Sequence, residues 1–241
     1  MKKILALLLS LTMVVCIFAA CGKDETNDIN AKSEGVMTYA EYDAAALDTE
    51  VVIEAYVQGF QGWWFDDSVG HGKITLYLQD ADGGYFAYEV NCDEETAGKI
   101  TKGTKVKVTG YKGAWEGEVE IMDGTLEIGE GTWVAEATDV TALLANEDEL
   151  IKHQNKFVSF KGLTVDSIEY KNGTPGNDIY VTVSLDGNAY SFCVESYLTG
   201  PDTEVYAAIG ALNAGDVVDI EGFLYWYQGV NTHITSVKTA G

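Results

Sequence analysis

The stretch "KGTKVKVTGYKGAWEG", from Lys102 to Gly117, is echoed by "AGDVVDIEGFLYWYQG", from Ala214 to Gly229, 112 residues further along the chain. Each stretch places apolar residues at alternate positions, then a glycine, then a loop rich in aromatic residues. Six positions agree at this offset: Ile100, Gly103, Val106, Val108, Gly110 and Gly117 fall on Leu212, Gly215, Val218, Ile220, Gly222 and Gly229. Because alternating apolar residues bury one face of a β-strand, the sequence predicts the same strand and loop twice.

The similarity extends upstream of these stretches. "KITLYLQDADGGYFAYEV" (73–90) matches "DIYVTVSLDGNAYSFCVE" (178–195), and both read as a strand, a glycine turn and a second strand. Strand-like segments also precede them, at residues 49–60 and 155–168. Each half therefore predicts the order strand, loop, strand, turn, strand, short helical link, strand, loop, strand. A repeat of this length exceeds the roughly 20 to 50 residues of solenoid units and indicates whole domains.

Five strands with a helical link before the fourth resemble the OB-fold, a small Greek-key barrel. The resemblance implies an all-β protein of two tandem OB-fold-like five-stranded Greek-key barrels with short helical links. We expect the first barrel at residues 37–138 and the second at residues 139–241. The segment "ALLANEDELIKHQ" (142–154) predicts an amphipathic helix leading into the second barrel. Its inward-facing residues are expected to be Leu143, Leu144, Leu150 and Ile151.

The N-terminus has the pattern of a secretory signal, with Lys2 and Lys3, an apolar run over residues 4–18, and a small-residue end at Cys21. "FAAC" is similar to the lipobox of bacterial lipoproteins, although Phe18 stands where that family usually has leucine. The resemblance implies a signal peptide at residues 1–20, lipidation of Cys21, a flexible linker at residues 21–36, and an extracytoplasmic protein anchored by lipid to the bacterial cell membrane. The alternative is an ordinary cleaved signal that contains a cysteine.

The chain is strongly acidic, with a formal net charge of −23 and no arginine. Removal of Lys2 and Lys3 with the signal would take the net charge to −25. Such a charge keeps a protein soluble and monomeric and repels phosphate. The composition therefore predicts a monomer and disfavours nucleic acid as a partner.

The residues offer little for catalysis or metal binding. His71, His153 and His233 stand apart from other candidate ligands. Asp80 and Asp82 resemble the start of a calcium loop, but the later ligands of such a loop are missing, and an acidic hairpin turn is the simpler interpretation. We expect no cofactor, no metal and no enzymatic activity, and keep a calcium-dependent enzyme as an alternative.

OB-folds usually bind ligands on the outer face of strands two and three and on the loops that join strands one to two and four to five. Aromatic residues are expected at these places in both halves: Trp63, Trp64, Tyr77, Tyr85, Trp115, Tyr170, Tyr180, Tyr225, Trp226 and Tyr227. They could equally fill the barrel cores. Because aromatic rings need no counter-charge, the sequence favours a non-catalytic binding or scaffolding protein for an oligosaccharide or protein ligand. The alternative is binding of single-stranded nucleic acid.

Overall fold

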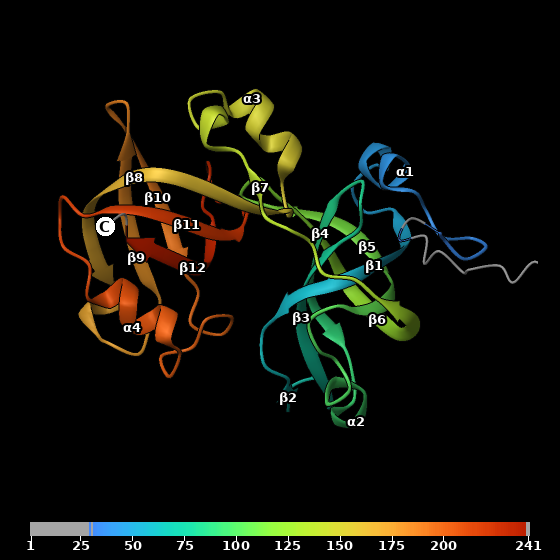
Figure 1. The fold of residues 1–241 in the computed structure, drawn as a ribbon. Coiled ribbons are helices and arrows are strands. Elements are labelled where there is room, and N and C mark those ends of the chain that lie inside the picture. Colours follow the sequence, from blue (N-terminus) through green and yellow to red (C-terminus); the bar gives the residue numbers. More distant parts are fainter. Residues whose placement is uncertain (1–28, 30, 240–241) are drawn as a thin grey trace, which may run out of the picture.

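The computed structural model describes residue 29 and residues 31–239, which form two β-barrels side by side (Figure 1). The first half contains α1 (Tyr39–Ala44), β1 (Glu50–Phe60), β2 (Trp64–Asp66), β3 (His71–Gln79), β4 (Gly84–Asn91), α2 (Glu94–Ala97), β5 (Thr104–Trp115) and β6 (Glu118–Thr132). The second half contains β7 (Thr138–Asp139), η1 (Thr141–Leu143), α3 (Glu147–Leu150), η2 (Ile151–His153), β8 (Phe157–Tyr170), η3 (Lys171–Gly173), β9 (Ile179–Leu185), β10 (Asn188–Val194), α4 (Glu204–Gly210), β11 (Val217–Phe223) and β12 (His233–Thr239).

Both sheets close in the same way. In the first, which we call barrel 1, strand β1 pairs with both β3 and β5, and the circle is completed by the parallel pairing of β4 with β6. In the second, barrel 2, strand β8 pairs with β9 and β11, and β10 runs parallel to β12. A first strand shared by both ends of the meander is the OB topology. The predicted fold class, two tandem OB-like barrels, is therefore confirmed.

The matched strands fill the two barrels as their alternation predicts. Val106 and Val108 of β5, and Val218 and Ile220 of β11, are completely buried in two separate apolar cores. Where the next strand crosses, a side chain at Gly110 would collide with Ile121, only 2.7 Å from the position of its Cβ. Gly222 occupies the matching place in barrel 2 and lies against the main chain of β12. Glycine at this position lets the neighbouring strand approach closely.

The segment that leads into barrel 2 differs from the predicted continuous helix. It is broken into η1, α3 and η2, because the Asn146 side chain accepts a hydrogen bond from Glu149 N and starts a new helix there. Leu144 and Leu150 are buried, but Ile151 is exposed rather than directed inward. Among the described residues, none of the helices has the length and apolar character needed to cross a membrane.

The two barrels are joined by a third apolar cluster of their own. It consists of Tyr77, Phe86 and Ala135 from the first half and Phe157 and Phe223 from the second. The rings of Tyr77 and Phe223 stack with centroids 4.6 Å apart. Burial of aromatic side chains contributes much of the energy of protein interfaces, so this cluster stabilises the contact between the two barrels.

Candidate binding site at the junction of the two barrels

Barrel 2 covers the surface of barrel 1 that an OB-fold normally offers to ligands. Tyr77 points outward from β3 as expected, but it is only 1% exposed because Phe223 stacks on it. Its hydroxyl lies 2.7 Å from Nδ1 of His233. Burial lowers the pKa of His233 to about 3, so the imidazole is neutral. The prediction that Tyr77 lines an open face is wrong, since that face is part of the junction.

Four other predicted ligand residues are structural. Tyr85 is fully buried in the core of barrel 1, so the prediction that it faces outward is wrong. Trp63 is half-buried, and its Nε1 donates a 2.8 Å hydrogen bond to the carbonyl oxygen of Cys92. Trp226 is 7% exposed and belongs to the core of barrel 2. Tyr170 is also packed against that core. These rings lie in the barrel cores or pack against them, which agrees with the alternative prediction that the aromatic residues fill the cores.

Tyr225 is half-buried, and the other predicted residues are exposed at two different places. Trp64 lies on β2 at the edge of barrel 1, where the Nζ atom of Lys73 is 5.3 Å from its ring centroid. Trp115 and Tyr227 instead lie next to the loop tips where the barrels touch, and Tyr180 is on β9 of barrel 2. The structure thus separates Trp64 from the others.

The contact between the barrels pairs equivalent positions of the repeat. Gln228 N donates to the carbonyl oxygen of Glu116 at 2.7 Å, and Gln228 Nε2 donates to Glu116 Oε2 at 2.8 Å. These residues are 112 positions apart, the offset of the repeat. The two loops that join the fourth and fifth strands of each barrel therefore meet tip to tip. Trp115 (53% exposed) and Tyr227 (46% exposed) directly precede the paired residues.

Further exposed or half-buried aromatic side chains lie near the junction on both barrels. We call the exposed or half-buried group the junction aromatics: Tyr88, Trp115, Tyr180, Tyr225 and Tyr227. Phe86 links two of them, with ring centroids 6.1 Å from Tyr88 and 5.4 Å from Tyr225. Tyr225 in turn stacks on His233 at 4.2 Å. Tyr88 and the buried His233 were not among the ligand residues predicted from sequence, because only the docking of the barrels brings Phe86 and Tyr88 of barrel 1 close to Tyr225 of barrel 2.

Three carboxyl groups near the junction differ from ordinary surface acids. Burial raises the pKa of Glu118 well above its usual range and also raises the pKa of Glu120. Glu118 nevertheless accepts a hydrogen bond from Trp226 N at 2.8 Å, which ties the two barrels together. Burial raises the pKa of Glu195, which directly follows β10, to about 7. With a pKa of about 7, Glu195 is only partly ionised at neutral pH, and the carboxyl groups of Glu118 and Glu120 are buried.

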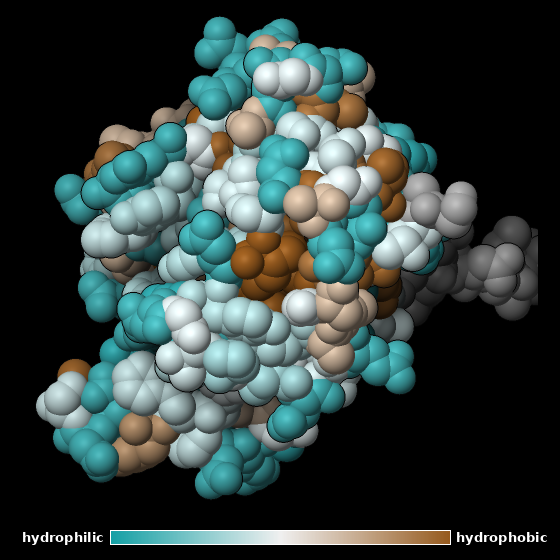
Figure 2. Space-filling view, turned by 90° about the vertical axis from the view of Figure 1, so that its left-hand side faces the viewer, coloured by the Kyte–Doolittle hydropathy of each residue, from teal (hydrophilic) through white to brown (hydrophobic). Residues whose placement is uncertain are grey.

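One ammonium group accompanies the junction aromatics on barrel 2. Lys171 forms a 2.8 Å ion pair with Asp178, the residue before β9, and Tyr180 is the second residue of that strand. The face drawn in Figure 2 is largely teal and white, with a brown patch near its centre. The site thus combines exposed aromatic rings, carboxyl groups with raised pKa values and a lysine.

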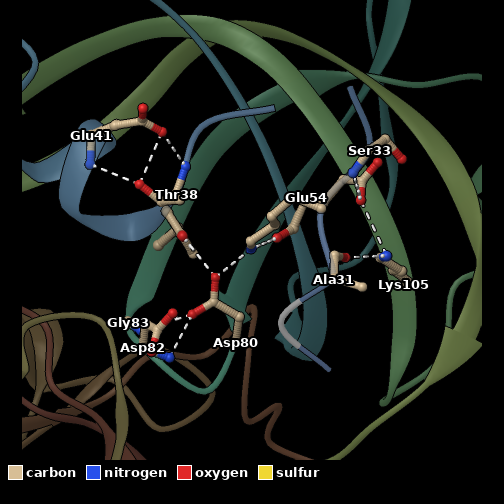
Figure 3. Close-up of polar contacts among 11 residues, drawn as sticks. Ala31, Ser33, Thr38, Glu41, Glu54, Asp80, Asp82, Gly83 and Lys105 are labelled. Carbon is tan, nitrogen blue, oxygen red and sulfur yellow. Dashed lines mark hydrogen bonds and ion pairs between the residues drawn. The ribbon is translucent and has the colours of Figure 1, made fainter. Parts of the chain in front are cut away.

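The acidic turn of barrel 1 does not have the form of a calcium loop. Asp80 is fully buried, and its Oδ1 accepts hydrogen bonds from Asp82 N and Gly83 N (Figure 3). Its Oδ2 accepts from the hydroxyl of Tyr85 and from the ammonium of Lys32. Within the described residues there is no group of three or more histidine, cysteine or acidic side chains placed to hold a metal ion. The hairpin-turn interpretation accounts for every oxygen of Asp80.

Comparisons with known proteins connect the chain to OB-type structures. No family model and no curated protein matches the sequence. A murine DNA-binding protein bound to double-stranded DNA is similar over 79% of this chain and 96% of its own, with 10% identity and a TM-score of 0.39. A HINa domain in complex with double-stranded DNA covers 81% of this chain and 97% of its own, at 8% identity and a TM-score of 0.37. A replication protein A heterotrimer bound to single-stranded DNA covers 83% of this chain and 51% of its own, with 12% identity and a TM-score of 0.34.

These neighbours correct two predictions made from the sequence. They are DNA-binding proteins, so the leading prediction of an oligosaccharide- or protein-binding module is wrong, as is the prediction that nucleic acid is disfavoured as a partner. The charge argument counted every carboxylate as ionised and exposed, whereas several lie buried at the junction. At such low identity the similarity concerns the fold, and a binding site has to be argued from this chain's own residues.

Proposed function

We propose that the protein binds single-stranded nucleic acid by stacking bases on the junction aromatics. The observation that carries the proposal is the meeting of the two loop tips, which places Trp115 and Tyr227 beside paired main chains. Stacking on an aromatic side chain contributes about 1 to 3 kcal/mol per base and tolerates any sequence, because every base has an aromatic face. Two barrels that share one surface offer more stacking positions than either alone.

The proposal must also account for an acidic chain. The carboxyl groups of Glu118 and Glu120 are buried, and Glu195 is half-buried, which reduces the charge that faces a phosphate. Lys171 supplies a cation next to Tyr180. With about one phosphate contact, a fourfold rise in salt should weaken binding only about threefold. A shallow salt dependence is therefore the expected signature of this site.

The direct test is the fluorescence anisotropy of a labelled oligo-dT or oligo-U strand with the full chain and its variants. Trp115→Ala and Tyr227→Ala should each weaken binding about tenfold, as expected for the loss of one stacked base. Tyr111→Ala is the matched control, since Tyr111 has the same 46% exposure as Tyr227 but lies on β5, opposite Glu50 of β1. Equal losses in all three variants, or no binding by the unmodified chain, would contradict the proposal.

The pH dependence tests the contribution of the acids separately. Glu195 is protonated below its raised pKa of about 7 and charged above it. Raising the pH from 6 to 8 should therefore weaken binding, because the new carboxylate repels phosphate. Glu195→Gln should remove most of that change, whereas Glu204→Gln, on α4, should not. If the binding affinity of Glu195→Gln depended on pH in the same way as that of the unmodified chain, Glu195 would not belong to the site.

We also propose that the protein acts without catalysis and is a lipoprotein held at the outer side of a bacterial membrane through Cys21. The support is the sequence pattern before that cysteine, which lies outside the described residues. Cys21→Ser should release the protein into the medium. Retention of the variant in the membrane fraction would argue against the anchor.

A further inference from the structure

Barrel 2 has a hollow that plays no part in the junction. It has a volume of about 570 Å³ and lies between the β9–β10 turn and the η1 segment. Its lining includes Leu144 and Leu185 on the apolar side and Asp186, Asn188 and Tyr190 on the polar side. The hollow is thus apolar in part, carries an exposed carboxylate and has an aromatic wall.

The repeat identifies the equivalent place in barrel 1. Tyr85 of β4 pairs with Leu78 of β3, and Tyr190 of β10 pairs with Val183 of β9, so the two tyrosines occupy matching positions of the two hairpins. The turns next to them, Asp80–Gly83 and Leu185–Asn188, are also equivalent. The hollow of barrel 2 therefore corresponds to the space around the Asp80 turn.

In barrel 1 the chain itself fills this space. The Nζ atom of Lys32 lies 2.6 Å from Asp80 Oδ2 and also donates to the carbonyl oxygen of Glu54. The ring of Tyr39 lies directly against Gly83. Figure 3 shows Asp80 and Glu54 on either side of this place. The occupants are thus the ammonium group of Lys32 and the ring of Tyr39. Lys32 and Ser33, within the segment 21–36, form hydrogen bonds to the barrel, and Tyr39 follows in α1.

Barrel 2 lacks both occupants. Met37 N donates a hydrogen bond to Val52 O, and Val140 N donates one to Ser159 O. Met37 and Val140 therefore occupy equivalent places, just before α1 in barrel 1 and η1 in barrel 2. Two residues further on, barrel 1 has Tyr39 and barrel 2 has Ala142, which lines the hollow. Among the described residues that line the hollow there is no lysine, because the chain before Val140 comes from barrel 1; the exposed Lys161 pairs with the lining residue Asp139. The missing ring and the missing ammonium together explain why space remains.

We propose that this hollow binds an organic cation that carries an ammonium group on an aromatic or apolar body. Asp186 would pair with the ammonium from the next position of the turn, because Leu185 stands where barrel 1 has Asp80. The ring of Tyr190 would contact the cation or the body, and Leu144 and Leu185 would cover its apolar side. Burial, followed by the negative charges of Asp186 and Glu147, raises the pKa of Tyr190. Glu147 therefore adds a second negative charge near the hollow. Cation–aromatic contacts of this kind recognise ammonium ligands in other proteins.

The test is calorimetric titration of the full chain with tyramine, which joins a phenol ring to a primary ammonium. Para-cresol, which has the ring without the ammonium, is the comparison probe. We expect tyramine to bind at least tenfold more tightly than para-cresol. Asp186→Asn should weaken tyramine binding about tenfold, and Ala142→Tyr should abolish it by restoring the ring that barrel 1 contains.

Asp67→Asn, in an exposed loop of barrel 1, is the control for net charge. Equal weakening by Asp67→Asn and Asp186→Asn would show only general attraction to an acidic protein and would overturn the proposal. Equal binding of para-cresol and tyramine would do the same, as would unchanged binding by a folded Ala142→Tyr variant. Should Ala142→Tyr fail to fold, the Asp186→Asn and Asp67→Asn pair still decides the matter.

Discussion

The two barrels share one topology and differ in what covers them. Barrel 1 has its ligand face under barrel 2 and the space around its Asp80 turn filled by Lys32 and Tyr39. Barrel 2 keeps Tyr180 and Tyr227 exposed and has a hollow at the equivalent turn. A duplicated fold therefore does not duplicate a binding site. Each copy's surroundings decide which of its surfaces a ligand can reach.

The largest effect should come from a charge placed in either core. Val108→Asp and Ile220→Asp should each lower the free energy of unfolding by more than about 4 kcal/mol, because the carboxylate has no partner inside a barrel. Differential scanning calorimetry should show that Val108→Asp leaves barrel 2 with a transition of its own, at a lower temperature than in the intact chain. Lys107→Asp, on the outward side of the same strand, is the control. Loss of every transition in Val108→Asp would mean that the barrels fold only together.

A buried lysine distinguishes the two copies. Lys112 Nζ donates to the carbonyl oxygens of Tyr42, Asp43 and Ala45 at 2.7 to 3.0 Å, whereas barrel 2 has the buried Leu224 at the matching position. Lys112→Leu should destabilise the chain by about 2 to 3 kcal/mol, because several carbonyl groups lose a charged donor.

Chemical denaturation measures the free energy of unfolding of the Lys112→Leu variant and of the unmodified chain. The control is Leu224→Met, at the equivalent position of barrel 2. It conserves volume and should cost less than about 1.5 kcal/mol. If the Lys112→Leu variant is as stable as the unmodified chain, the three hydrogen bonds contribute nothing to barrel 1.

The junction should make stability depend on pH through Glu118. Because burial raises its pKa in the folded state, the folded chain holds the proton more tightly than the unfolded chain does. Stability should therefore fall as the pH rises above about 4.3, by up to about 1.4 kcal/mol per pH unit. In Glu118→Gln this slope should become shallower, with Glu120 and Glu195 contributing what remains, and the variant's advantage in melting temperature should grow from pH 5 to pH 8. Glu127→Gln, exposed on the same strand, should show no such trend.

The smallest effect should come from the side-chain contact between the two loop tips. Glu116 and Gln228 are both exposed, and their main-chain hydrogen bond survives side-chain truncation. A double-mutant cycle with Glu116→Ala and Gln228→Ala should therefore give a coupling of about 0.5 kcal/mol. A coupling several times larger would mean that this contact, rather than the apolar cluster behind it, holds the barrels together.

Part of the site was within reach of sequence reasoning. Trp115, Tyr180 and Tyr227 were predicted from their places in the fold, and all three are exposed. Tyr77 and Tyr85 were placed on one outward phase, but Glu89 has φ of 48° and the β3–β4 register shifts, which breaks the alternation in this hairpin. A period-two pattern cannot show such a shift, because it assumes an unbroken strand.

The sequence by itself determined the two barrels, because alternating apolar residues and matched glycines act locally and recur at one offset. Only the tertiary structure decided which surfaces remain available. The stacking of Phe223 on Tyr77, the burial of Glu118 and the filling of one turn by Lys32 join residues 146, 108 and 48 positions apart. Contacts over such separations depend on how the barrels dock, and no local periodicity in the chain encodes that docking.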